Sequence, residues 1–139
     1  MLDLRTAPYA ALILRLTLGM LFLAHAGLKL FVFTPAGTVG FFGQLGLPAV
    51  VAYATIALEI VGGIALILGV QTRVVSLAMV PVLLGAIVLV HGANGFWFTA
   101  SGGGWEFPAF WAAALLVQAL LGDGAHALRI GALASPASA

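Results

Sequence analysis

Residues 9–33 read YAALILRLTLGMLFLAHAGLKLFVF, an apolar run interrupted only by single arginine, histidine, lysine and threonine residues. It is long enough to cross a bilayer as a helix, which takes about 20 apolar residues. Three further apolar runs follow at residues 48–69, 74–91 and 108–122, separated by segments rich in glycine and proline. The sequence therefore predicts an all-α, polytopic membrane protein, an antiparallel bundle of four transmembrane helices.

The composition of the whole chain supports this prediction. Of its 139 residues, 63% are hydrophobic and only 6% are charged, whereas about 25% are charged in soluble domains. A net charge of +1 provides no basic surface for nucleic acid. The absence of cysteine excludes disulfides and thiolate metal sites. We expect one membrane domain over residues 1–139, in contact with lipid, without a metal ion and without nucleic acid.

Positive charges outside the apolar runs lie on one side of the predicted topology. Arg5 precedes the first run, Arg73 lies between the second and third, and Arg129 follows the fourth, whereas residues 34–47 and 92–107 contain no lysine or arginine. The positive-inside rule then predicts that both termini lie in the cytoplasm of a bacterium, with the protein in its inner membrane. The first run resembles a signal peptide cleavable after Ala26, but its apolar character continues to Phe33, so we expect a retained helix.

Four titratable side chains lie inside or near the ends of the predicted helices. A charge at the bilayer centre costs ~2.5–3.5 kcal/mol, so such residues normally face the bundle interior in pairs. We expect Arg15 and Glu59 to form a buried ion pair that fixes helix register. In the alternative interpretation, Glu59 donates or accepts a proton. His25 and Lys29 are four residues apart and therefore share one helix face.

A second polar group gathers at the outer ends of the helices. His91 ends the third run, and Glu106 precedes the fourth. Most aromatic residues lie toward this end too: Phe31, Phe33, Phe41, Phe42, Phe96, Trp97, Phe98, Trp105, Phe107, Phe110 and Trp111. These rings fit an interfacial aromatic belt and, equally, the walls of a ligand pocket. Residues 37–45 are expected to form a short interfacial helix.

A quinone requires ring-lined walls, hydrogen-bond donors to its two carbonyl oxygens, and titratable groups that deliver protons. We predict such a site in an outward-facing pocket. Its predicted quinone-binding residues are His25, Lys29, His91, Trp105 and Phe96, and its predicted catalytic residues are Glu59, Glu106 and His91. Alternatively, Glu106 is a loop anion paired with Lys29. Haem b fits less well, because His25 lies about 12 Å below the outer helix end, where His91 sits.

Several short strings in this order and spacing resemble the DoxX family of small four-helix membrane proteins. They are Arg15-x-x-x-Gly19, Phe22-Leu23-Ala24-His25-Ala26-Gly27-Leu28-Lys29, Gly46-Leu47-Pro48, Glu59-x-x-Gly62-Gly63, Gly69-x-x-Thr72-Arg73, His91-Gly92 and Gly102-Gly103-Gly104-Trp105-Glu106-Phe107-Pro108. The chain departs from the pattern where Ala26, and not glycine, follows the histidine of the first helix. The matching polar positions are Arg15, His25, Lys29, Glu59, Arg73, His91 and Glu106.

The resemblance implies respiratory quinone chemistry, because the family is named after a subunit of a thiosulfate:quinone oxidoreductase. Other members are linked to oxidative or thiol stress in partner complexes. We expect a membrane subunit of a quinone-linked oxidoreductase whose electrons come from a protein partner or an external donor. A non-catalytic membrane anchor or assembly factor and a small-molecule carrier are the alternatives. The sequence leaves the partner, the quinone type and homo-oligomer formation open.

Overall fold

A computed structural model of the chain describes residues 3–128, and these form helices and connecting segments without a strand. The long helices are α1 (Ala7–Gly27), α3 (Ala49–Leu68), α4 (Thr72–Ala86) and α5 (Glu106–Leu121). A shorter helix, α2 (Thr34–Gln44), lies between α1 and α3. Two π-helical turns, η1 (Leu28–Val32) and η2 (Ile87–His91), continue α1 and α4, and a 3-10 turn, η3 (Gly92–Asn94), follows η2. The fold is the predicted all-α, four-helix membrane bundle.

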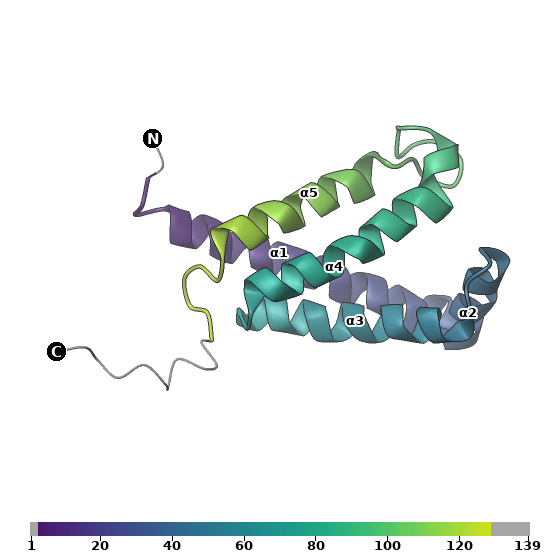
Figure 1. Cartoon of the computed structure of the whole chain (residues 1–139), viewed down its shortest axis with the longest axis horizontal. Coiled ribbons are helices and arrows are strands. Elements are labelled where there is room, and N and C mark those ends of the chain that lie inside the picture. The colour runs from purple at the N-terminus through teal and green to yellow at the C-terminus, as the bar shows by residue number, and fades with distance from the viewer. Residues whose placement is uncertain (1–2, 129–139) are drawn as a thin grey trace.

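The long helices pack as two antiparallel pairs, α1 with α3 and α4 with α5. The pairs diverge toward the end that carries α2 and the loop after η3, as Figure 1 shows. The start of α1, the α3–α4 turn and the segment after α5 lie together at the opposite end. We call these two ends of the bundle the α2 end and the terminal end.

Three helical segments are long and apolar enough to cross a membrane: Ala7–Val32, Ala49–Leu68 and Thr72–Asn94. The fourth, Glu106–Leu121, is equally apolar in character but has only 16 residues. At 1.5 Å per residue it extends about 24 Å, somewhat less than the ~30 Å hydrocarbon core.

The core between the pairs is apolar and compact. It consists of Leu18, Phe22, Leu66, Met79, Leu83, Trp111, Ala112 and Leu115. Glycine allows the closest approach of α1 to α3, because a Cβ placed on Gly19 would lie 2.6 Å from the carbonyl oxygen of Gly63. This close crossing fixes the spacing of the first helix pair, because small residues let two helices approach closely.

The helix boundaries lie within a few residues of the predicted ones. Gly69 and Gly122 terminate α3 and α5 as expected, and Pro48 caps the start of α3. Two features differ: residues 28–32 and 87–91 are π-helical, and the interfacial helix begins at Thr34 instead of residue 37. Arg129 lies outside the described residues. The assignment of residues 1–139 to one domain stays a prediction.

The predicted ion pair between Arg15 and Glu59 is wrong. Arg15 is 1% exposed at the terminal end, where its Nη1 donates to the carbonyl oxygens of Leu66 (3.1 Å) and Ile67 and its Nη2 donates to that of Ala125 (2.8 Å). The last carbonyls of a helix have no partner within it, so a cation that binds them is favourable. Arg15 therefore caps α3 and ties down the segment after α5.

Candidate ligand-binding site

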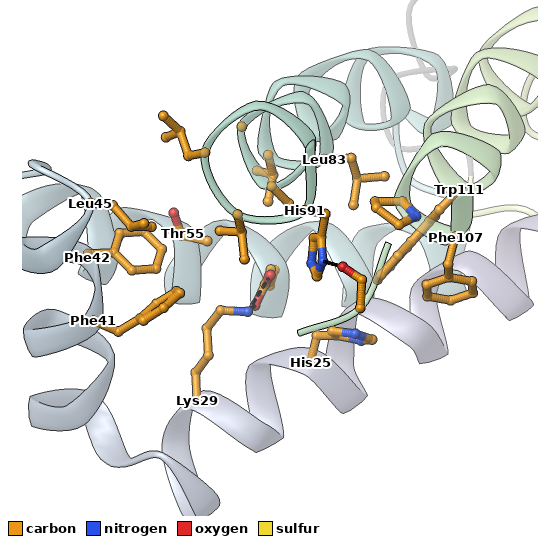
Figure 2. Close-up of a pocket in the computed structure, with 18 of the residues that line it drawn as sticks. His25, Lys29, Phe41, Phe42, Leu45, Thr55, Leu83, His91, Phe107 and Trp111 are labelled. Carbon is orange, nitrogen blue, oxygen red and sulfur yellow. Dashed lines mark hydrogen bonds and ion pairs between the residues drawn. The ribbon is translucent and has the colours of Figure 1, made fainter. Parts of the chain in front are cut away.

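A cavity of about 1420 Å³ occupies the space between the diverging helix pairs at the α2 end. Its lining includes residues from all five α-helices, both π-helical turns and the loop before α5. The walls are predominantly apolar and rich in aromatic rings, and Figure 2 shows several of these side chains pointing into it. Its volume exceeds the ~300–1,000 Å³ typical of sites for drug-sized ligands.

Lys29 and Glu59 form an ion pair inside this cavity. The Lys29 Nζ donates to both carboxylate oxygens of Glu59 at 2.8 Å, and the two side chains are 17% and 5% exposed. The lysine comes from η1 and the glutamate from the middle of α3. The pair therefore bridges α1 to α3 while facing the cavity (Figure 2). The sequence placed both residues correctly near the site but assigned Glu59 the wrong cation.

The side chains of His25 and His91 also line the cavity (Figure 2). The Nδ1 of His25 lies 2.9 Å from the carbonyl oxygen of Leu21, and the Nδ1 of His91 lies 2.9 Å from that of Gly103. A carbonyl oxygen only accepts, so Nδ1 carries the proton in both rings. In its neutral form, each imidazole is thereby restricted to one tautomer, in which Nε2 carries the lone pair.

The loop after η3 brings Gly103 to His91. Asn94 Nδ2 donates to the same Gly103 oxygen at 2.9 Å, so the loop carbonyl receives two side-chain hydrogen bonds. The next residue must be glycine, because a Cβ on Gly104 would lie 2.2 Å from the carbonyl oxygen of Trp97. This glycine run therefore lets the loop fold tightly over the mouth of the cavity.

Glu106 lines the cavity but does not contact Lys29, so the alternative pairing of these two residues is wrong. Its Oε1 instead accepts a hydrogen bond of 2.7 Å from the backbone N–H of Phe98. Glu106 is also the first residue of α5, where a carboxylate interacts favourably with the helix dipole. Glu106 thus holds the loop against the helix and still has a second carboxylate oxygen.

Two predicted binding residues do not belong to the lining. Trp105 and Phe96 pack edge to face in the loop, with ring centroids 4.8 Å apart, and neither contributes to the cavity wall. Their sequence position toward the outer ends of the helices suggested a place in the pocket, but the two rings pack against each other in the loop. The binding and catalytic roles assigned to His25, Lys29, Glu59, His91 and Glu106 stay predictions.

The remaining wall of the cavity could be predicted only in part from the sequence. Phe41, Phe42 and Leu45 point into the cavity from α2 and its end (Figure 2), as expected for a helix that turns its apolar face inward. Phe107 and Trp111 close the other side, with ring centroids 5.7 Å apart. Their spacing of four residues places them on one face of α5.

The π-helical turns are the feature that sequence reasoning missed. η1 carries Lys29 and η2 ends at His91, so each turn supplies a polar residue of the cavity. Such local widening of a helix often occurs at functional sites. No residue pattern in the sequence marks the two turns, apart from Gly92, which directly follows η2.

Comparison with known proteins assigns the larger part of the chain to one family. Residues 10–92 match the family described as DoxX. The chain belongs to the DoxX family. The match includes His25, Lys29, Glu59 and His91 and ends before the loop and α5.

Two curated relatives are similar in sequence. One, from Bacillus subtilis, is named "Putative oxidoreductase CatD" and is 40% identical over 79 residues, which cover 57% of this chain and 58% of the relative. The other, from Mycobacterium tuberculosis, is named "Uncharacterized membrane protein Rv3486" and is 31% identical over 102 residues, covering 65% and 62%. This chain thus spans about three fifths of the length of each relative. No solved structure matches.

Proposed function

We propose that this protein is the membrane subunit of a quinone-linked oxidoreductase and that it binds a quinone in the cavity at the α2 end. The observation that carries this proposal is one large, ring-lined cavity that holds the Lys29–Glu59 pair and two histidines with free Nε2 atoms. The name of the Bacillus subtilis relative is consistent with an oxidoreductase.

The residues present fit a quinone in three respects. The apolar walls suit a ring and an attached apolar tail, and the volume exceeds what a small polar metabolite needs. The carboxylates of Glu59 and Glu106 and the two imidazoles can hold or release protons beside the ring. A bound quinone would supply the electron-accepting chemistry, which no cysteine or metal cluster of the described residues provides.

The placement of charge supports an orientation. Arg5 and Arg73 lie at the terminal end of the bundle, whereas residues 34–47 and 92–107, at the α2 end, contain no lysine or arginine. We therefore propose that the terminal end lies in the cytoplasm of a bacterial inner membrane and that the cavity faces outward. In this orientation, a partner protein or an external donor would deliver electrons on the outer side.

A carrier is less well supported by the structure. A polar path through the bundle would have to join the Lys29–Glu59 pair to Arg15 at the terminal end. Glu59 and Leu66, whose carbonyl binds Arg15, are separated by about 10 Å of helix α3. The apolar core residues Phe22, Leu66 and Met79 are completely buried between the two polar regions.

The direct test is purification of the full chain with its native lipids, followed by solvent extraction, identification of any bound quinone and an absorption spectrum for haem. We expect close to one quinone per protein and no Soret band. A Lys29→Met/Glu59→Leu double variant should retain much less quinone than the wild type. A folded wild-type protein without quinone would instead support the membrane anchor, and a Soret band would support haem.

A further inference from the structure

Most side-chain hydrogen-bond donors of the cavity are engaged within the protein. Lys29 uses two of its three N–H groups on the oxygens of Glu59, which leaves one free. The indole N–H of Trp111 has no partner among the described residues, but it is completely buried. The hydroxyl of Thr38 donates to the carbonyl oxygen of Thr34 at 2.9 Å, and that of Thr55 donates to the carbonyl oxygen of Val51 at 2.8 Å. The backbone N–H of Phe98 donates to Glu106. A ligand that only accepts hydrogen bonds therefore finds few free donors on the wall.

Several hydrogen-bond acceptors of the cavity, in contrast, have no partner within the described residues. Because Nδ1 of His25 and of His91 is bound to a backbone carbonyl, each neutral ring presents Nε2 as an acceptor. Neither Nε2 has a hydrogen-bond partner among residues 3–128. Neither of these two atoms is completely buried. Both nitrogens are thus accessible to a ligand. Glu106 has a second oxygen, Oε2, to which no described residue donates.

From this imbalance we propose that the cavity binds the reduced, dihydroxy form of a quinone in preference to the oxidised form. The proposal rests on the proposed function above, and it names the redox state that the same site selects. Each hydroxyl of the reduced form donates one hydrogen bond, and His25 and His91 supply two accessible acceptors. The oxidised form has two carbonyl oxygens and no donor, so it leaves both Nε2 atoms without a partner.

The two redox forms have nearly the same ring shape, so their apolar contacts with the walls largely cancel in a comparison. Selectivity then depends on the hydrogen bonds to the two imidazoles. One net neutral hydrogen bond corresponds to roughly a fivefold change in affinity, and two correspond to roughly 25-fold. Groups from the other elements that line the same cavity are the Lys29–Glu59 pair and Glu106.

The experiment measures the affinity of the full chain in lipid nanodiscs for three probes by equilibrium dialysis without oxygen. The probes are tetramethyl-1,4-benzoquinone, its hydroquinone, and the dimethyl ether of that hydroquinone. The ether keeps both oxygens but has no hydrogen-bond donor. We expect the hydroquinone to bind roughly 10- to 25-fold more tightly than either of the other probes.

Asparagine variants separate the two ring nitrogens. His25→Asn and His91→Asn retain an amide N–H close to the position of Nδ1, which can still bind the carbonyl of Leu21 or Gly103, but they remove Nε2. Each variant should lose roughly fivefold in hydroquinone affinity and keep its quinone affinity. The matched control is His126→Asn, because His126 is exposed beside Tyr9 at the terminal end and should not affect either affinity.

The results separate this proposal from the one on which it rests. Equal affinities of the wild type for quinone and hydroquinone would overturn the redox selectivity while supporting a quinone site. An equal loss of both affinities in the asparagine variants would also overturn it, because that result indicates a damaged cavity. If the wild type binds neither redox form, the proposed function itself fails.

Discussion

Helix α1 and its π-helical continuation carry two cations, Arg15 and Lys29, about four turns apart. Each cation has different hydrogen-bond partners at its end of the bundle. Arg15 is enclosed by backbone carbonyls of α3 and of the segment after α5. Lys29 binds one carboxylate and faces a large cavity. The first arrangement closes a helix end and has no room for a ligand. The second arrangement leaves polar groups accessible to a ligand. Arg15 is therefore a structural cation, whereas Lys29 is a candidate functional cation.

Replacing Arg15 should produce the largest loss of stability. In Arg15→Met, the carbonyls of Leu66, Ile67 and Ala125 lose the guanidinium donor in an enclosed place, and only that of Leu66 keeps another donor, the N–H of Gly69. We expect this change to lower the free energy of unfolding by about 3 kcal/mol. The measurement is reversible unfolding in mixed micelles of increasing denaturing detergent. Arg15→Lys keeps the charge and should lose less. A quinone content that falls in Arg15→Lys, with the fold intact, would contradict a purely structural role.

Replacing one member of the Lys29–Glu59 pair should lower stability less than replacing Arg15 does, and it should weaken ligand binding more. Glu59→Gln leaves Lys29 without its anion, which costs roughly 3–5 kcal/mol in a fully enclosed pair. Because the cavity lets water reach the ammonium group, we expect about 2 kcal/mol here. Lys29→Met/Glu59→Leu should restore most of that stability. If the double variant also recovers ligand binding, the pair is structural like Arg15.

One added methyl group at the close crossing of α1 and α3 should lower the stability of the protein. Gly19→Ala places a Cβ 2.6 Å from the Gly63 carbonyl oxygen, so α1 and α3 must separate. Overpacking of this kind costs about 1–3 kcal/mol, and we expect a value near the lower limit because α1 can shift slightly. Gly40→Ala is the control, since its Cβ would meet no atom within 4 Å. Equal unfolding midpoints for both variants would contradict the close crossing.

The smallest effect on stability and ligand affinity is expected for Trp105, whose ring lies outside the cavity wall. Trp105→Phe should change stability by less than about 0.5 kcal/mol and leave ligand affinity unchanged. Phe42→Leu, on the wall itself, should weaken binding of tetramethyl-1,4-benzoquinone at similar stability. A stronger effect of the Trp105 variant than of the Phe42 variant would place the ligand in the loop instead of the cavity.

The fold followed from the sequence because the bilayer imposes simple rules. Four apolar runs with glycine and proline between them leave helices as the only structure that pairs every backbone group inside lipid. Single residues also indicate where helices begin and end, as Pro48 does before α3 and Gly69 after it. These signals are local, so they do not depend on how the helices pack.

The pairing of the charged residues did not follow, because it depends on packing. The sequence indicates the depth of Arg15, Lys29 and Glu59 in the membrane, and Arg15 appeared close enough to reach Glu59. Two facts were missing. The close crossing at Gly19 and Gly63 sets how α1 and α3 align, and Lys29 lies in the π-helical turn η1. A helix end that needs a cation is likewise visible only once the end of α3 is placed beside Arg15.

The most direct test of the central claim, that the α2 end is the ligand site, is the quinone content of the protein purified with native lipids. Wild type, Arg15→Lys and Lys29→Met/Glu59→Leu should be compared at equal amounts of folded protein. We expect close to one quinone per chain in the wild type and in Arg15→Lys, and a small fraction of that in the double variant. Equal quinone content in all three, or none in the wild type, would contradict it.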